Sequence, residues 1–158
     1  MSTISQELPE DTDSVITFIE TRYHATHRQE LSELVPLARK VETVHRDVAE
    51  VPRGLADLLE QMADELNAHM QKEEQVLFPL MRQGGHPMIS HPIAMMTAEH
   101  DDHVERLRSL EALTNNFTPP EQACNSWRAL YAGARKLTDD VREHIHTENT
   151  VLFPRFLG

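Results

Sequence analysis

One eleven-residue pattern occurs twice in this chain, and it constrains the fold more than any other feature of the sequence. It reads H-x-x-x-E-x-x-x-L-F-P, first from His69 to Pro79 and again, 75 positions later, from His144 to Pro154. Residues four apart lie on one face of an α-helix, so each copy directs an imidazole and a carboxylate into the same space. This is an arrangement of metal ligands, and the chain contains it twice.

The repeat extends upstream of this pattern. His24-x-x-His27 is matched by His100-x-x-His103, 76 positions later, so each half of the chain has one His-x-x-His and one His-x-x-x-Glu segment. The repeating unit is therefore a pair of helices. Two copies are too few for a solenoid, which needs about three repeats to bury a core. We predict an all-α fold, an antiparallel four-helix bundle with an internal two-fold pseudo-repeat.

Length and charge exclude several classes of protein. A chain of 158 residues suits a single domain. Its 15 Lys and Arg against 26 Asp and Glu give a net charge of −11, which argues against nucleic acid or an anionic membrane surface as a partner. The N-terminus lacks a signal-peptide pattern, and no apolar run approaches the roughly 20 residues of a membrane span. We therefore expect a cytoplasmic protein.

The low numbers of cysteine and glycine exclude some kinds of metal site and favour a helical fold. The single cysteine, Cys124, excludes an intrachain disulfide and any thiolate-rich zinc or iron–sulfur site. Only five glycines interrupt a chain rich in helix-forming residues. We expect residues 1–12 to form a tail and residues 13–158 to form the bundle. The expected helices run from Asp13 to about His45 with a kink at Pro36, from Leu55 to the Gly84–Pro92 loop, from Ile93 to Leu113, and from a Thr118–Glu121 capping box to about Phe156.

Buried carboxylates indicate that the motif residues bind a metal. Glu73 and Glu148 continue the apolar stripes of their helices, and an inward-facing carboxylate costs several kcal/mol unless it is paired or bound to a cation. The same cost arises twice, so we predict a shared cation site. His69 and His144 lie on the same stripes. On the other two helices the partners are either His24 and His100 or their neighbours His27 and His103, and periodicity does not choose between them.

Four His and two Glu then make a set of six ligands. Imidazole and carboxylate suit iron, manganese or zinc, whereas the lack of thiolates disfavours copper(I) and structural zinc. Six ligands are too many for one reactive ion. If both glutamates bridge two ions, each ion receives two nitrogens and two oxygens, and a bridging oxide or hydroxide leaves one position of an octahedron open.

Other acids and histidines fit this site less well. A ferritin-like site uses Glu-x-x-His, and Glu42-x-x-His45 and Glu143-x-x-His146 match that string, but neither lies on an apolar stripe. We expect His45, His86, His91 and His146 to be exposed. Glu65 and Asp140 each precede a motif histidine by four residues, so they either orient that imidazole or are ordinary solvated acids.

Five segments carry a resemblance to a known family: Arg22-Tyr-His24-x-x-His27-Arg, His69-Met-x-Lys-Glu73-Glu-Gln-x-Leu-Phe-Pro, Glu99-His100-Asp, Thr114-Asn-Asn-x-Thr-Pro-Pro and His144-x-x-x-Glu148-Asn-x-Val-Leu-Phe-Pro-Arg. With them, the chain from about Asp13 to Gly158 resembles hemerythrin-like di-iron proteins, and more closely the repair-of-iron-centres (YtfE/ScdA-type) family. The resemblance implies a non-haem di-iron site, oxo- or hydroxo-bridged. Its terminal ligands are His24, His69, His100 and His144, its bridging carboxylates are Glu73 and Glu148, and acids matching Glu65 and Glu99 line a polar route to the metals.

The resemblance also implies a function. Members of this family restore iron–sulfur clusters after nitrosative or oxidative damage, so the expected partners are apo or damaged iron–sulfur proteins. Nitric oxide or O2 is the expected small-molecule ligand, and we expect a monomer. Full-length members usually carry an N-terminal domain with a Cys-Cys pair, so this sequence is expected to be a short form. Four histidines rather than the five of oxygen-carrying hemerythrins favour iron donation or nitric oxide scavenging over O2 storage, and the sequence does not separate these two.

Overall fold

The computed structural model describes residues 8–158, so the first seven residues of the predicted tail lie outside the described range. Within that range the chain forms helices and no strand, as predicted. The first long helix begins at Thr12, one residue before the predicted start. It consists of α1 Thr12–Phe18, η2 Ile19–His24 and α2 Ala25–Val44, and the second long helix consists of α3 Leu55–Lys72, η3 Glu73–Leu77 and α4 Phe78–Arg82. The third is α5 Ser90–Leu113. The fourth consists of α6 Asn125–Thr147, η4 Glu148–Leu152 and η5 Phe153–Phe156.

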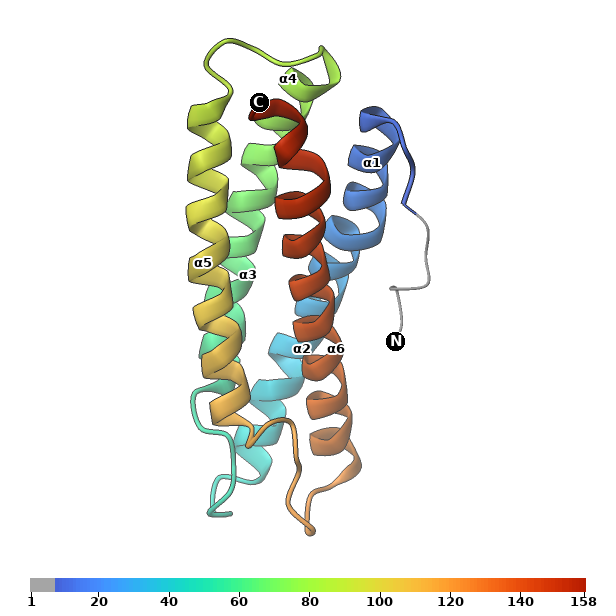
Figure 1. Ribbon diagram of the computed structural model, residues 1–158. Coiled ribbons are helices and arrows are strands. Elements are labelled where there is room, and N and C mark those ends of the chain that lie inside the picture. Colours follow the sequence, from blue (N-terminus) through green and yellow to red (C-terminus); the bar gives the residue numbers. More distant parts are fainter. Residues whose placement is uncertain (1–7) are drawn as a thin grey trace.

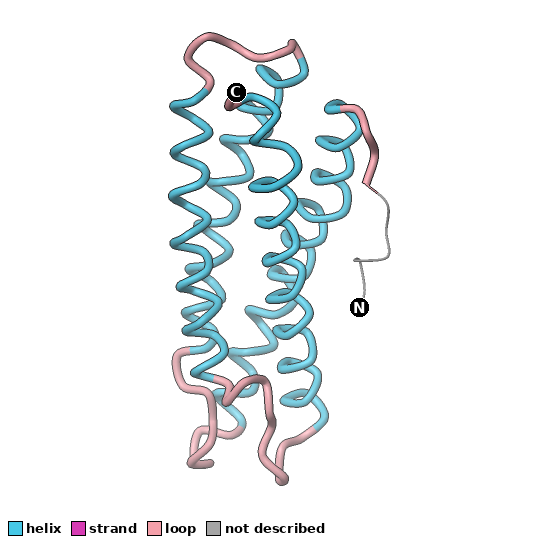
Figure 2. The backbone as a smooth tube through the Cα atoms, viewed as in Figure 1, coloured by secondary structure: helices cyan, strands magenta, loops and turns pink. Residues whose placement is uncertain are grey.

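The four long helices lie side by side and alternate in direction, which confirms the antiparallel bundle (Figure 1). The connections between α2 and α3 and between α5 and α6 cross one end of the bundle (Figure 2). The connection between α4 and α5 crosses the other end, where the C-terminus also lies. None of the helices within residues 8–158 has the length and apolar character needed to span a membrane.

The layer of predicted metal ligands, called the ligand layer below, divides the apolar core into two clusters. The larger cluster packs between α2, α3, α5 and α6, and it includes Leu66, Leu107 and Val141. The smaller cluster joins α1, α4, the start of α5 and the C-terminal turns, and it includes Phe78 and Leu152. On each long helix the predicted metal ligands lie between the two clusters. The fold therefore places them in the middle of a buried bundle, with apolar side chains above and below.

Prolines explain two irregular turns at the ligand layer. Pro79 and Pro154 have no N–H, and in a regular α-helix their rings would clash with the carbonyl four residues back. The preceding Phe78 and Phe153 instead donate to carbonyls five residues back, at Glu73 and Glu148. These wider π-helical turns, η3 and η4, start at the two repeated glutamates. π turns are frequent at functional sites, and here the repeated sequence pattern itself supplies them.

The start of the fourth helix differs from the expectation. The fourth helix begins at Asn125 and not in the Thr118–Glu121 capping box, because Pro119 and Pro120 each bias the preceding residue away from helical angles. Cys124 caps α6 instead, its sulfur accepting the N–H of Trp127 at 3.5 Å. In the first helix, α2 continues through Pro36, so the kink expected there stays a prediction. The π-helical turn η2, Ile19–His24, lies upstream of that proline.

Candidate metal centre

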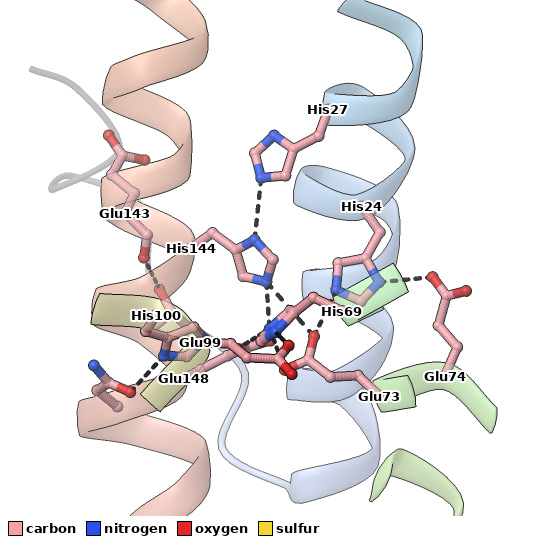
Figure 3. Close-up of polar contacts among 12 residues, drawn as sticks. His24, His27, His69, Glu73, Glu74, Glu99, His100, Glu143, His144 and Glu148 are labelled. Carbon is pink, nitrogen blue, oxygen red and sulfur yellow. Dashed lines mark hydrogen bonds and ion pairs between the residues drawn. The ribbon is translucent and has the colours of Figure 1, made fainter. Parts of the chain in front are cut away.

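The first repeated glutamate spans two histidines from different helices. Glu73 Oε1 lies 3.1 Å from Nε2 of His24, which comes from η2, and Glu73 Oε2 lies 3.3 Å from Nε2 of His69, one turn earlier on α3. All three side chains are almost completely buried. Both oxygens of this carboxylate therefore face imidazole nitrogens, one on each side (Figure 3).

The second repeated glutamate does the same with the other two histidines. Glu148 Oε1 lies 2.8 Å from Nε2 of His100, and Glu148 Oε2 lies 2.9 Å from Nε2 of His144. The six side chains thus divide into two groups that share both carboxylates, and within each group the donor atoms lie within 4.8 Å of one another. The two groups are His24, His144, Glu73 and Glu148, and His69, His100, Glu73 and Glu148.

The charges of these buried groups fit a cation. Burial and the neighbouring Glu148 raise the pKa of Glu73 well above its usual range. Burial opposes it, yet the carboxylates of Glu148 and Glu73 raise the pKa of His69 to about 11. His69 Nε2 and Glu73 Oε2 face each other while both lack a hydrogen-bond partner. Two enclosed carboxylates with imidazoles turned toward them therefore need positive charge, which metal ions would supply better than protons.

The outward nitrogen of each histidine is also held. When a neutral imidazole binds a metal through Nε2, its proton is on Nδ1, and a partner for that proton fixes both the tautomer and the ring orientation. The Nδ1 atoms have four different partners: Glu74 at 2.7 Å for His24, Glu99 at 2.8 Å for His69, Asn149 at 2.9 Å for His100, and Nε2 of His27 at 3.0 Å for His144. The bundle therefore orients all four imidazoles before any metal binds.

Sequence reasoning missed three of these partners. Glu74 and Asn149 each follow a repeated glutamate directly, so the offset of 75 that relates the ligands also relates their partners. That offset could have identified them. Periodicity offers His27 only as an alternative ligand, but its Nε2 lies 3.0 Å from Nδ1 of His144, on the side of that ring away from the carboxylates. His103, the other alternative, packs its ring against His69 with centroids 4.9 Å apart.

The remaining histidines lie away from the site. His86, His91 and His146 are exposed, as expected, whereas His45 is half-buried with its Nε2 3.1 Å from the sulfur of Cys124. The ferritin-like strings do not form a site either. Glu42 accepts the N–H groups of Gly54 and Ala56 at the start of α3, and Glu143 lies 3.5 Å from the hydroxyl of Tyr23.

The three acids expected beside the ligands differ in position. Glu99 accepts a hydrogen bond from His69 and pairs with Lys72. Glu65 is held by two hydrogen bonds from Arg106, each 3.0 Å, and forms no hydrogen bond with His69. Both acids line a groove of about 250 Å³ between α3 and α5. Asp140 is the exception, because it pairs with Arg22 at 2.9 Å and Lys136 at 2.7 Å and forms no hydrogen bond with a predicted ligand.

Comparison with known proteins agrees with this geometry. The model of the hemerythrin HHE cation-binding domain matches residues 15–156, nearly the whole described chain. The chain belongs to the hemerythrin HHE family. The match covers all six residues of the two donor groups, and binding of cations is the property that the family description names.

Similar full sequences carry the name iron–sulfur cluster repair protein YtfE. Those from Yersinia pseudotuberculosis serotype O:1b (strain IP 31758) and Yersinia pestis (strain Pestoides F) are each 51% identical over 144 residues, which is 91% of this chain and 65% of theirs. The one from Enterobacter sp. (strain 638) is 50% identical over 144 residues, 91% of this chain and 66% of its own. The chain therefore spans just under two thirds of the length of these relatives.

Proposed function

We propose that the chain holds two iron ions and donates iron for the repair of damaged iron–sulfur clusters. The observation that carries the two-ion site is the geometry of the shared carboxylates, because each places one oxygen toward one histidine pair and its other oxygen toward the second pair. One ion would not need both oxygens of both acids directed to opposite sides. The ligand set of His24, His69, His100, His144, Glu73 and Glu148 would hold the pair.

Iron is the metal best supported by the donors and the relatives. Mixed imidazole and carboxylate ligands suit iron, and the three relatives above are named for the repair of iron–sulfur clusters. Each donor group offers two nitrogens and two carboxylate oxygens, fewer than the six that iron commonly accepts. The open positions would let a bridging oxide or hydroxide, or an exchanging ligand, reach the ions when they are bound.

The chain's own residues would prepare the site for binding and release. The four outward hydrogen bonds hold the Nε2 lone pairs toward the centre, and the two apolar clusters exclude water from either end of the ligand layer. The acids of the α3–α5 groove would offer exchangeable oxygen ligands to a ferrous ion on its way to an acceptor. Expected acceptors are apo or damaged iron–sulfur proteins, consistent with the names of the relatives.

A second function, scavenging or sensing of nitric oxide, is favoured by one observation. The same open positions that permit exchange would admit a diatomic ligand, because neither donor group fills a coordination shell. Reversible binding of O2 would use the same space. The two principal functions differ in outcome, since iron is lost to an acceptor in the first and kept as a nitrosyl adduct in the second.

One experiment tests both. Protein loaded anaerobically with 57Fe is analysed for metal content and by Mössbauer spectroscopy, before and after addition of an apo iron–sulfur acceptor or of nitric oxide. Iron donation predicts two coupled irons per chain that decrease as clusters form in the acceptor. A lone zinc or a single mononuclear iron at full occupancy would refute the two-iron site. Iron that stays bound with the acceptor but forms a nitrosyl adduct would favour scavenging.

A further inference from the structure

Two of the four imidazoles in the predicted ligand set have a carboxylate behind them. Nδ1 of His24 lies 2.7 Å from a carboxylate oxygen of Glu74 (Figure 3). Nδ1 of His69 lies 2.8 Å from a carboxylate oxygen of Glu99. The side chains of the two acids are also alike in exposure, at 26% and 25%. Each of these two histidines therefore gives its outward proton to a partly exposed acid.

A cation holds each of the two acids. Arg28 donates to both oxygens of Glu74, at 2.9 and 3.1 Å. Lys72 pairs with one oxygen of Glu99, and the other oxygen accepts the hydrogen bond from the histidine. A cation at such a distance keeps a carboxyl group ionised. A negative charge is therefore fixed behind both imidazoles.

The other two imidazoles have an uncharged acceptor. Nδ1 of His100 lies 2.9 Å from the amide oxygen of Asn149, which follows Glu74 at the repeat distance of 75 residues. Nδ1 of His144 lies 3.0 Å from Nε2 of the completely buried His27. An imidazole that accepts a hydrogen bond through Nε2 has its one proton on Nδ1 and is neutral. The four outward partners thus differ in charge although all of them accept the same kind of hydrogen bond.

The two charged partners are divided evenly between the two donor groups. The group that contains His24 and His144 has one imidazole backed by a carboxylate and one backed by a neutral acceptor. The group that contains His69 and His100 has the same combination. A carboxylate behind an imidazole makes it a stronger donor, and mutation of such a partner typically changes metal affinity by about 10–100-fold. Both carboxylates behind one group would therefore make the two ions unequal.

We propose that Glu74 and Glu99 are positioning residues that match the two ions, because each gives one ion one strong imidazole donor. The inference rests on the two-iron site of the proposed function. A negative charge behind an imidazole stabilises a ferric ion more than a ferrous ion, since the attraction grows with the charge of the metal. Matched donors therefore keep the reduction potentials of the two irons close together, and unmatched donors separate them.

Moving one carboxylate from one ion to the other tests the match without changing the net charge. In the unbalanced variant, Glu74→Gln removes the carboxylate behind His24 and Asn149→Asp adds one behind His100. One ion then has both carboxylates and the other has none. The balanced control combines Glu99→Gln with the same Asn149→Asp change, so the carboxylate moves between the two histidines of a single ion. Every replacement keeps the length of the side chain and an acceptor for the imidazole N–H.

The measurement is an anaerobic redox titration of protein reconstituted with two irons, in which each ferric ion takes one electron from an added reductant. Electron paramagnetic resonance gives the amount of the mixed-valent pair, and hence the constant for its formation from the oxidised and reduced pairs. We expect this constant to rise at least about tenfold in the unbalanced variant and to stay at the wild-type value in the balanced control. No rise in either variant would overturn the match, and an equal rise in both would overturn it by assigning the effect to Asn149→Asp alone.

A second set of variants covers loss of metal. An unbalanced variant that keeps one iron where the balanced control keeps two would also support the match. The single variants Glu74→Gln and Glu99→Gln unbalance the ions in opposite directions, so each should raise the constant and their combination should return it toward the wild-type value. Rises that add in the combination would overturn the match.

The match and the proposed function can fail separately. Wild-type protein that never holds two irons would overturn the two-iron site. Two irons that stay bound, with one unchanged constant in all the variants, would overturn the match and leave the two-iron site intact. Formation of clusters in an apo acceptor is measured independently of these constants, so its absence would overturn iron donation alone.

Discussion

Two seams of this bundle each hold one pair of predicted ligands: His69 and His100 lie between α3 and α5, and His24 and His144 lie between η2 and α6. The two seams share Nδ1 partners at equivalent positions, Glu74 and Asn149, but differ in other neighbours. Across the α3–α5 seam the histidine pair is flanked by Glu99 and a polar groove, and across the η2–α6 seam by Tyr23 and a buried histidine. The predicted ligands are buried polar groups, so replacing one of them alone leaves the others without a partner in an apolar core. Each neighbour needs only to accept the N–H of its imidazole, which a carboxylate, an amide or another imidazole can do. The surroundings of the site can therefore differ between the two halves of the repeat while the predicted ligands stay the same.

The largest effect should come from the residues that both seams share. Glu73→Ala and Glu148→Ala each remove an oxygen from both donor groups, so we expect each variant to lose both ions. Iron per chain after anaerobic reconstitution and desalting measures this. His27→Ala and His103→Ala should retain more iron than either variant. If all four variants lose the same amount, the inward stripe has been assigned wrongly.

A smaller effect should separate the histidines that lie behind the ligands. His27 accepts the outward hydrogen bond of His144, whereas its counterpart His103 only packs against His69. Loss of such a partner typically lowers metal affinity by about 10–100-fold, so His27→Ala should weaken binding by about that factor. His103→Ala should change it by much less. Competition with a chelator of known affinity gives both values, and equal weakening would show that the hydrogen bond to His144 contributes nothing.

The acids of the groove should affect rate more than affinity. A double variant Glu65→Gln with Glu99→Gln keeps the shape of the groove and the acceptor for His69, and it removes two charges. We expect transfer of iron to an apo acceptor to slow by about tenfold, or about 1.4 kcal/mol in the barrier, while both irons stay bound until the acceptor is added. Asp140→Asn, which changes the counterpart of Glu65 on the other seam, should leave the transfer rate unaltered. A slower rate in that variant would contradict a single route.

The smallest effect concerns stability of the metal-free protein in acid. Burial and the imidazoles of His69 and His100 lower the pKa of His103 from 6.5 to about 3. Between these values the unfolded chain binds a proton that the folded chain does not, so the free energy of unfolding decreases as pH falls. We expect this residue to contribute a loss of about 1 kcal/mol between pH 6.5 and about pH 5.5.

Urea denaturation of metal-free wild-type protein and of His103→Gln measures this contribution. The variant should lose stability less steeply across the same pH range. His69 adds little to this pH dependence of the free energy of unfolding. Its pKa is raised to about 11, so its stabilising contribution is already complete below pH 6.5. Identical slopes for the two proteins would show that His103 can be protonated in the folded state.

The fold could be predicted from the sequence because the same inward-facing His-x-x-x-Glu pattern occurs twice. The ligand set stays a prediction, and its choice of His24 and His100 over His27 and His103 comes from the family resemblance and not from periodicity. An inward Glu73 alone fits many structures, but an inward Glu148 at the same offset, each with its histidine, predicts a shared buried site. The π-helical turns that begin at both glutamates were not foreseen. They depend on how a proline ring meets the preceding turn, and sequence periodicity assumes a regular helix.

Helix ends and contacts between helices were harder to predict. Thr118 and Glu121 match the sequence pattern of a capping box. The two prolines between them nevertheless restrict the backbone angles of that segment, which stays outside the helix. The contact of Tyr23 with His144 joins residues far apart in the chain. The sequence predicts that each of these side chains is buried, but it does not predict that the two are in contact.

The division of the core by the ligand layer has a consequence for cooperativity. The smaller apolar cluster is built from both ends of the described chain and from α4, and its contact with the larger cluster runs through a layer of buried polar groups. Without metal, that layer carries the electrostatic cost of two buried carboxylates, so we expect the smaller cluster to become a unit that can open while the larger one stays folded. Ions bound to residues on all four helices tie the two units into one. Amide hydrogen exchange around Phe78 and Phe153 would then slow sharply on metal binding, and exchange around Leu130 would change little.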